Sequence, residues 1–92
     1  MSVLPDELSV LRQQIDEIDS QLVELLAKRA KITAKVGKYK SQAGLPINVP
    51  EREAQLIAKR RVKAQQQHVA PYIIQFLLRH IMRYHYHNKH FA

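Results

Sequence analysis

The apolar residues in the first half of the chain recur at alternating steps of three and four. They form a seam that consists of Leu8, Leu11, Ile15, Ile18, Leu22, Leu25, Ile32, Val36 and Tyr39. This spacing predicts one long amphipathic helix. Because Pro5 suits a first helical turn and Gly44 suits a helix end, we expect the helix to cover about 5–41. The seam is interrupted at one position, where Arg29 replaces the expected leucine.

Two shorter helices are predicted after the first. A loop leads to Pro50, a favourable first-turn residue, and a second helix is expected over about 50–66. After a break at 68–71, a third amphipathic pattern predicts a helix over about 71–89. Its apolar residues are Ile73, Ile74, Leu77, Leu78, Ile81 and Met82. The sequence therefore predicts an all-α fold of one long and two shorter helices, in a single domain over 1–92.

The length of the first helix indicates a partner subunit. About 36 helical residues at roughly 1.5 Å each make a rod of about 54 Å. A compact domain of this size has a radius of gyration near 12 Å, so such a rod extends well beyond a monomeric core. Because the seam is apolar along the helix except at Arg29, we expect an intertwined homodimer in which two long helices pair and the shorter helices pack across them.

Composition and charge narrow the function. The chain has 92 residues, a formal net charge of +7 and a sequence pI near 10.0, which favour anionic partners such as nucleic acid, an acidic membrane surface or small polyanionic metabolites. The absence of cysteine excludes disulfides and thiolate metal sites. No apolar run is long enough to cross a membrane, and the N-terminus does not resemble a secretory signal. We expect a soluble cytoplasmic protein.

Three cationic residues of the first helix are candidates for binding an anion. Arg29 and Lys40 are eleven residues apart, which places them on nearly the same face of the helix. Arg12 lies about 25 Å from Arg29 and about 80–100° around the axis, so only an antiparallel dimer would bring it to the partner's pocket. Alternatively, Arg29 reaches solvent or pairs with Glu53, and the other two are ordinary surface charges.

The shorter helices also carry polar residues on their apolar faces. Glu53 shares a face with Val49, Leu56, Ile57 and Arg60. In the third helix, His85 and Lys89 continue the stripe of Ile74, Leu78 and Ile81. The pattern predicts that polar groups from three helices converge on one pocket in an all-helical core.

The run LRQQIDEIDSQLVELLAKRAKITAKVGKYKSQAGLPINVPERE carries three recognisable motifs. They are an LRxxID start, an LLxxR followed eleven residues later by lysine, and a PERE after the loop. With these motifs the chain resembles the all-helical chorismate mutases, and most of all the mutase domain that precedes prephenate dehydrogenase in bifunctional enterobacterial proteins. The resemblance implies an intertwined dimer that rearranges chorismate to prephenate without metal or cofactor, and in which each site is completed by an arginine of the other subunit.

The resemblance also implies roles for individual residues. Arg29 and Arg12 of the partner subunit would clamp the two substrate carboxylates, a task suited to planar guanidinium groups. Lys40 would donate to the ether oxygen and a carboxylate. Glu53 would accept from the ring hydroxyl, together with backbone at Val49. Catalysis would come from holding a compact conformer and from stabilising charge on the ether oxygen.

Three further residues belong to the expected substrate site. Arg52 would add positive potential beside the hydroxyl-binding group. His85 and Lys89 stand where the family commonly has serine and, four residues later, glutamine or glutamate. An ammonium can donate to the ether oxygen, so Lys89 is a candidate catalytic residue, although it can instead point to solvent.

Four alternative functions are also compatible with parts of the sequence. His87 and His90 lie near His85 in sequence, but no HExxH motif or carboxylate partner accompanies them, and we expect no metal. Aromatics interleaved with bases occur in nucleic-acid-binding proteins, but a solvated basic face is the simpler account. An isochorismate-pyruvate lyase of the same fold is the close enzymatic alternative, disfavoured by Glu53, because the lyases that this chain resembles carry an apolar residue there. The alternative without enzymatic activity is a basic helical dimer with a binding or regulatory role.

Overall fold

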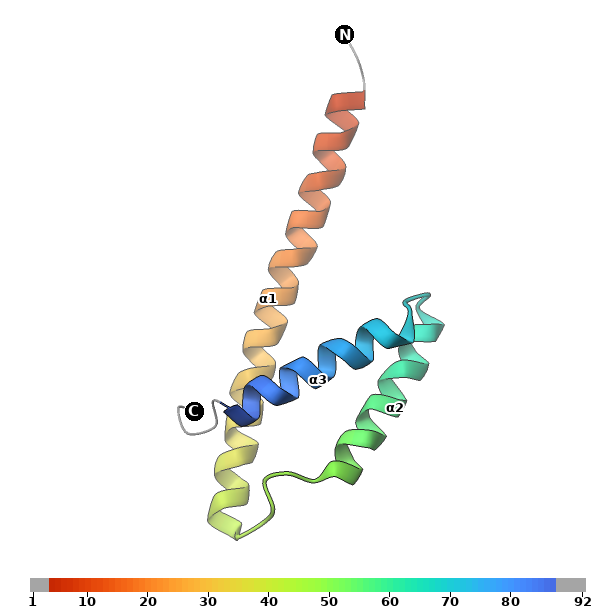
Figure 1. Ribbon diagram of the computed structural model, residues 1–92. Coiled ribbons are helices and arrows are strands. Elements are labelled where there is room, and N and C mark those ends of the chain that lie inside the picture. Colours follow the sequence, from red (N-terminus) through yellow and green to blue (C-terminus); the bar gives the residue numbers. More distant parts are fainter. Residues whose placement is uncertain (1–3, 88–92) are drawn as a thin grey trace. The chain divides into compact units, whose positions relative to one another are not determined.

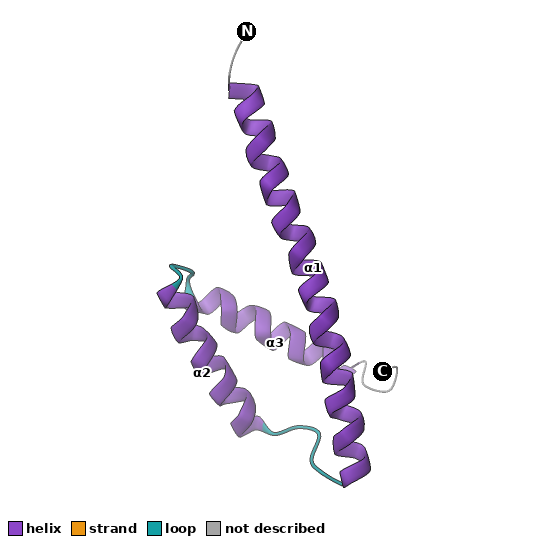
Figure 2. Cartoon of the chain, turned by 180° about the vertical axis from the view of Figure 1, so that it is seen from behind, coloured by secondary structure: helices purple, strands orange, loops and turns teal. Residues whose placement is uncertain are grey.

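The computed structural model describes residues 4–87, and the side chains of residues 6–84. Three helices make up this part of the chain: α1 (Leu4–Ala43), α2 (Pro50–Gln66) and α3 (Pro71–His87) (Figures 1 and 2). Residues 4–87 contain no strand. The prediction of an all-α fold with one long and two shorter helices is confirmed. The chain forms two compact units that divide between Ile32 and Thr33. The single domain expected over 1–92 stays a prediction.

The first unit consists of the N-terminal part of α1. Acidic residues stand in its first turn, at Asp6 and Glu7, where they complement the positive end of the helix dipole. Between residues 6 and 32 every side chain is exposed except Arg29, which is half-buried. The seam residues are among the exposed ones, with Leu22 at 50% and Ile18 at 57% exposure. This segment thus has an amphipathic pattern without a core of its own.

α1 ends in a hydrogen-bonded C-terminal cap. Gly44 has a positive φ of 68°, a conformation that glycine adopts without the steric cost of a side chain. The Leu45 N–H donates to the carbonyl of Lys40 at 2.8 Å, and the Gly44 N–H donates to that of Ser41 at 3.4 Å. This pair of bonds is the Schellman arrangement, which satisfies carbonyls that the helix leaves unpaired.

α2 and α3 form a helical hairpin within the second unit (Figure 1). The two buried residues of the described chain, Ile57 and Ala64, lie seven positions apart and therefore on the same face of α2. Arg61 lies between them on this face, and its Nη1 donates to Oε1 of Gln75 on α3 at 2.6 Å. Apolar packing and the part-buried hydrogen bond between Arg61 and Gln75 contribute to holding the two helices together.

The connection between α2 and α3 is a short turn that ends α2 in the same manner as α1. The Val69 N–H donates to the carbonyl of Ala64 at 2.8 Å, and the His68 N–H donates to that of Gln65 at 3.2 Å. His68 has a positive φ of 60°, in the left-handed region that glycine usually occupies at this point of a helix end. Pro71 then starts α3 in a first-turn position, where a missing N–H costs nothing.

Candidate functional site

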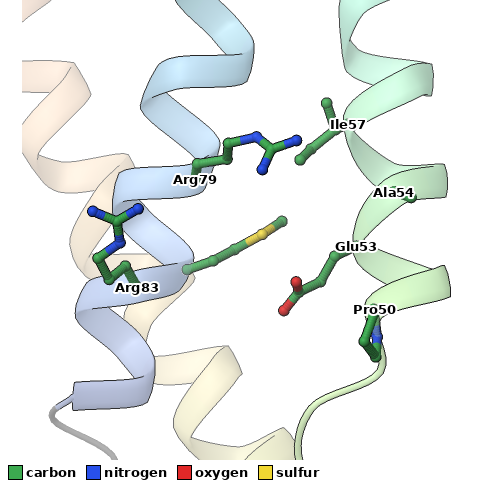
Figure 3. A pocket seen from close by; sticks show the side chains of 7 residues that line it. Pro50, Glu53, Ala54, Ile57, Arg79 and Arg83 are labelled. Atoms are coloured by element: carbon green, nitrogen blue, oxygen red, sulfur yellow. The ribbon is translucent and has the colours of Figure 1, made fainter.

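A pocket of about 500 Å³ lies at the end of the hairpin away from the turn. The first two turns of α2 contribute Pro50, Glu53, Ala54 and Ile57, and the C-terminal half of α3 contributes Arg79, Met82 and Arg83 (Figure 3). Its volume lies within the range of small-molecule sites. Apolar side chains form much of the lining and three charged groups face across it, so the pocket suits a small polar ligand with an apolar body.

Glu53 is the acidic residue of this pocket. It is half-buried, and its carboxylate points from α2 towards α3 (Figure 3). Its position is fixed by the start of α2, because Pro50 occupies a first-turn position and the Glu53 N–H donates to the carbonyl of Val49 at 3.1 Å. Val49 is the N-cap residue of α2, and it directly precedes Pro50, which lines the pocket.

Arg79 and Arg83 supply the positive charge of the pocket. They are four residues apart and so lie on one face of α3. The Arg79 side chain extends across the pocket towards Ile57 on α2, whereas the Arg83 side chain stays beside α3 (Figure 3). Both side chains are exposed to solvent. A ligand in the pocket can therefore reach them.

Lys40 makes a contact with the loop that precedes α2. Its Nζ donates to the carbonyl oxygen of Ile47 at 3.3 Å, and the residue is half-buried. Lys40 is not among the residues that line the pocket. The ammonium group nevertheless has two further hydrogens, so the contact with Ile47 leaves it able to donate to an anion.

The other residues expected at the site are distributed over both units and the chain end. Arg12 is exposed and Arg29 is half-buried, both in the first unit. Arg52 is exposed on the first turns of α2 and does not line the pocket. His85 belongs to α3, but its side chain lies outside the described part of the structure, as does the whole of Lys89.

The apolar periodicity predicts an inward position for Glu53 and assigns Met82 to the apolar stripe of α3, but it does not indicate Arg79 or Arg83. All four residues line the pocket. One signal for the arginines exists in the sequence. They are spaced four apart in a helix that contains no acidic residue, so neither can form the usual ion pair within its own helix.

Among the side chains that the structure describes, those of residues 6–84, no group of three histidine or acidic side chains could hold a metal ion. Within residues 4–87, no helix combines the length and the apolar character needed to cross a membrane.

Residues 4–87 form an all-helical structure with a pocket of mixed charge between α2 and α3. The family model described as chorismate mutase type II matches residues 11–89. The chain therefore belongs to the chorismate mutase type II family.

Several curated proteins are similar to the chain. A T-protein of Enterobacter agglomerans is 52% identical over 77 residues, which are 84% of this chain and 21% of the relative. A T-protein of Haemophilus influenzae is 40% identical over 84 residues, which are 91% of this chain and 22% of the relative. A chorismate mutase of Methanocaldococcus jannaschii is 44% identical over 48 residues, 52% of this chain and 48% of the relative. The chain thus spans about a fifth of each T-protein. No solved structure matches the chain.

Proposed function

We propose that the chain catalyses the rearrangement of chorismate to prephenate, a step of aromatic amino acid biosynthesis. The observation that carries the proposal is the family match over residues 11–89, together with the location of Glu53 in a pocket between α2 and α3. The reaction is pericyclic, so it requires no nucleophile, no proton donor and no cofactor. What it requires is a pocket that holds one conformer of a dianion and stabilises charge as the ether bond breaks.

The proposed site uses cations of α1 for the carboxylates and the ether oxygen. Arg29 and Arg12 of the partner subunit clamp the two carboxylates, because guanidinium groups match the carboxylate geometry. Lys40 donates to the ether oxygen and to a carboxylate. The contact between Lys40 and Ile47 supports this role, since it holds the ammonium near the loop that leads into α2.

The hydroxyl end of the substrate is assigned to the start of α2. Glu53 accepts a hydrogen bond from the ring hydroxyl, with the backbone at Val49 beside it, and Arg52 adds positive potential. Lys89 is assigned to donating to the ether oxygen in place of the family's glutamine or glutamate, and His85, four positions earlier in the sequence, is assigned to substrate binding. The inward direction of the Glu53 carboxylate supports the first of these roles (Figure 3).

The proposed active form is a homodimer. Its support is the exposed seam of α1, in which large apolar residues such as Leu11, Leu25 and Ile32 are 55–60% exposed in the single chain. A monomeric protein rarely leaves so long an apolar stripe in water. Pairing with a second copy would cover the seam and bring Arg12 to the site of the partner subunit.

The test is the loss of chorismate absorbance with purified protein, with identification of the product. The wild type should form prephenate, and Arg29→Ala should lower kcat/KM by roughly 100-fold or more, since one charge-assisted bidentate contact to the dianion is lost. The matched control is Lys28→Ala, which removes one positive charge from an exposed neighbouring position.

Two results would contradict the proposal. If the wild type leaves chorismate unchanged but releases pyruvate from isochorismate, the chain is a lyase. If it acts on neither compound, the fold serves a binding role, and nucleic-acid affinity that falls steeply with salt would then identify a basic helical module.

A further inference from the structure

The acidic residue of the pocket conflicts with an anionic ligand. Glu53 is half-buried, so water screens its carboxylate less than that of a fully exposed side chain. A dianion that enters this pocket is repelled by the carboxylate over a distance of several ångströms. The benefit of a hydroxyl contact with Glu53 is therefore accompanied by an electrostatic cost, and a neighbouring cation is needed to offset it.

Two cations line the same pocket on the facing helix. Arg79 and Arg83 stand against the single carboxylate of Glu53, so the lining has one more positive than negative charge. The remaining lining side chains are apolar and carry no charge of their own. The helix that supplies the arginines contains no acidic residue to neutralise them. The pocket therefore attracts an anion in spite of its acid.

The two arginines differ in where they place their charge. The Arg79 side chain extends over the pocket towards Ile57, while the Arg83 side chain remains beside α3 (Figure 3). Coulomb attraction falls with distance, so the group that extends over the pocket has the larger effect on a bound ligand. Both lie outside the set of residues on which the proposed mechanism depends.

We infer that Arg79 is a further substrate-binding residue, which offsets the charge of Glu53 and attracts a dicarboxylate to the pocket, and that Arg83 supports it more weakly from the rim. The inference rests on the proposed function and adds a specificity-determining group at the hydroxyl end of the site. Arg79 would distinguish substrates by their charge, since a ligand with fewer carboxylates gains less binding energy from its guanidinium group.

The first test measures KM and kcat of Arg79→Gln. Its control is Lys59→Gln, because Lys59 is an exposed residue of α2 outside the pocket and its replacement also removes one positive charge. Arg79→Gln should raise KM roughly five- to tenfold with kcat within about twofold, because the attraction acts equally on ground state and transition state. Arg79→Lys should restore most of the affinity, and added salt should reduce the difference. Arg83→Gln should have a smaller effect, and Lys59→Gln none.

A double variant separates this role from a structural one. If Arg79 binds the substrate, its removal should raise KM by a similar factor in the wild type and in Glu53→Gln. If Arg79 only holds Glu53 in place, its removal should change nothing further once Glu53 is replaced. That second result would overturn the inference, as would equal effects of Arg79→Gln and Lys59→Gln on KM.

A binding experiment keeps the inference distinct from the proposed function. The probe is 5-hydroxyisophthalate, a ring with two carboxylates and one hydroxyl that cannot rearrange, measured by calorimetry. If the wild type does not convert chorismate but binds the probe more tightly than Arg79→Gln does, the proposed function fails, and Arg79 is retained only as a residue that binds dicarboxylates. If chorismate is converted and both proteins bind the probe equally, the inference fails and the function stands. An inactive wild type that does not bind the probe overturns both.

Discussion

Residues 6–32 of α1 and the α2–α3 hairpin both carry apolar residues at helical spacing, but only the hairpin buries any of them. Ile57 and Ala64 are 8% and 5% exposed, whereas no apolar residue among residues 6–32 is even half-buried. The hairpin also has a hydrogen bond between its helices, from Arg61 to Gln75. Apolar residues at helical spacing are therefore exposed in one region of the chain and buried in the other.

In the proposed dimer, this difference separates the part of the chain that packs within one copy from the part that a second copy covers. A turn between α2 and α3 brings two apolar faces together, because antiparallel neighbours need only a short connection. Residues 6–32 form a continuous stretch of helix without such a turn, and in the proposed dimer a second copy covers their seam.

The largest predicted effect is the loss of dimer stability when a charged residue is placed in the α1 seam. In the proposed dimer, Leu22→Asp buries a carboxylate between two helices and should cost about 3 kcal/mol or more, equivalent to at least roughly 100-fold in the dissociation constant. Sedimentation should show monomers at micromolar concentration, with parallel loss of mutase activity. Gln21→Asp, an exposed position beside the seam, should leave the dimer intact. If both variants sediment as the wild type does, the seam is not the interface.

An intermediate effect is expected from the core of the hairpin. Ile57→Ala removes buried apolar volume and should lower the free energy of unfolding by about 2–4 kcal/mol, measured by urea denaturation. The control is Val62→Ala on the outward side of α2, where 56% exposure predicts a change within about 0.5 kcal/mol. Equal losses for the two variants would mean that the hairpin has no packed core of its own.

The smallest effect is expected at the turn between α2 and α3. His68→Gly should raise the free energy of unfolding by about 0.5–1 kcal/mol, because glycine adopts the positive φ of this position without steric cost. Gln67→Gly, one residue earlier at a φ of −94°, should bring no such gain. A loss of stability in His68→Gly would show that the imidazole makes a compensating contact.

The three helices could be predicted because proline and glycine residues stand at their ends. Pro50 and Pro71 stand at the first turns of α2 and α3, and Gly44 follows the end of α1. The conformation of His68 could not be predicted, since a histidine carries no sign that it must adopt the left-handed region. Which apolar stripes are buried could not be predicted either, because burial depends on neighbours and not on periodicity.

The candidate site was predictable only in part. Glu53 was found because a carboxylate on an apolar stripe is unusual, and it lines the pocket. Arg79 and Arg83 were overlooked because charged residues off the apolar stripe of a helix normally face solvent. The contact of Lys40 with Ile47 could not be predicted, since its acceptor is a backbone carbonyl that no side chain reveals. The roles of Arg12, Arg29, Arg52, His85 and Lys89 stay predictions.

The short turn at 67–70 also has a consequence for the order of assembly. Contacts between helices joined by so few residues have a low contact order, and such structures form in microseconds to milliseconds. The hairpin can therefore form in a unimolecular step. In the proposed dimer, the α1 seam is buried only when two chains meet, so refolding would include a second phase whose rate rises with protein concentration.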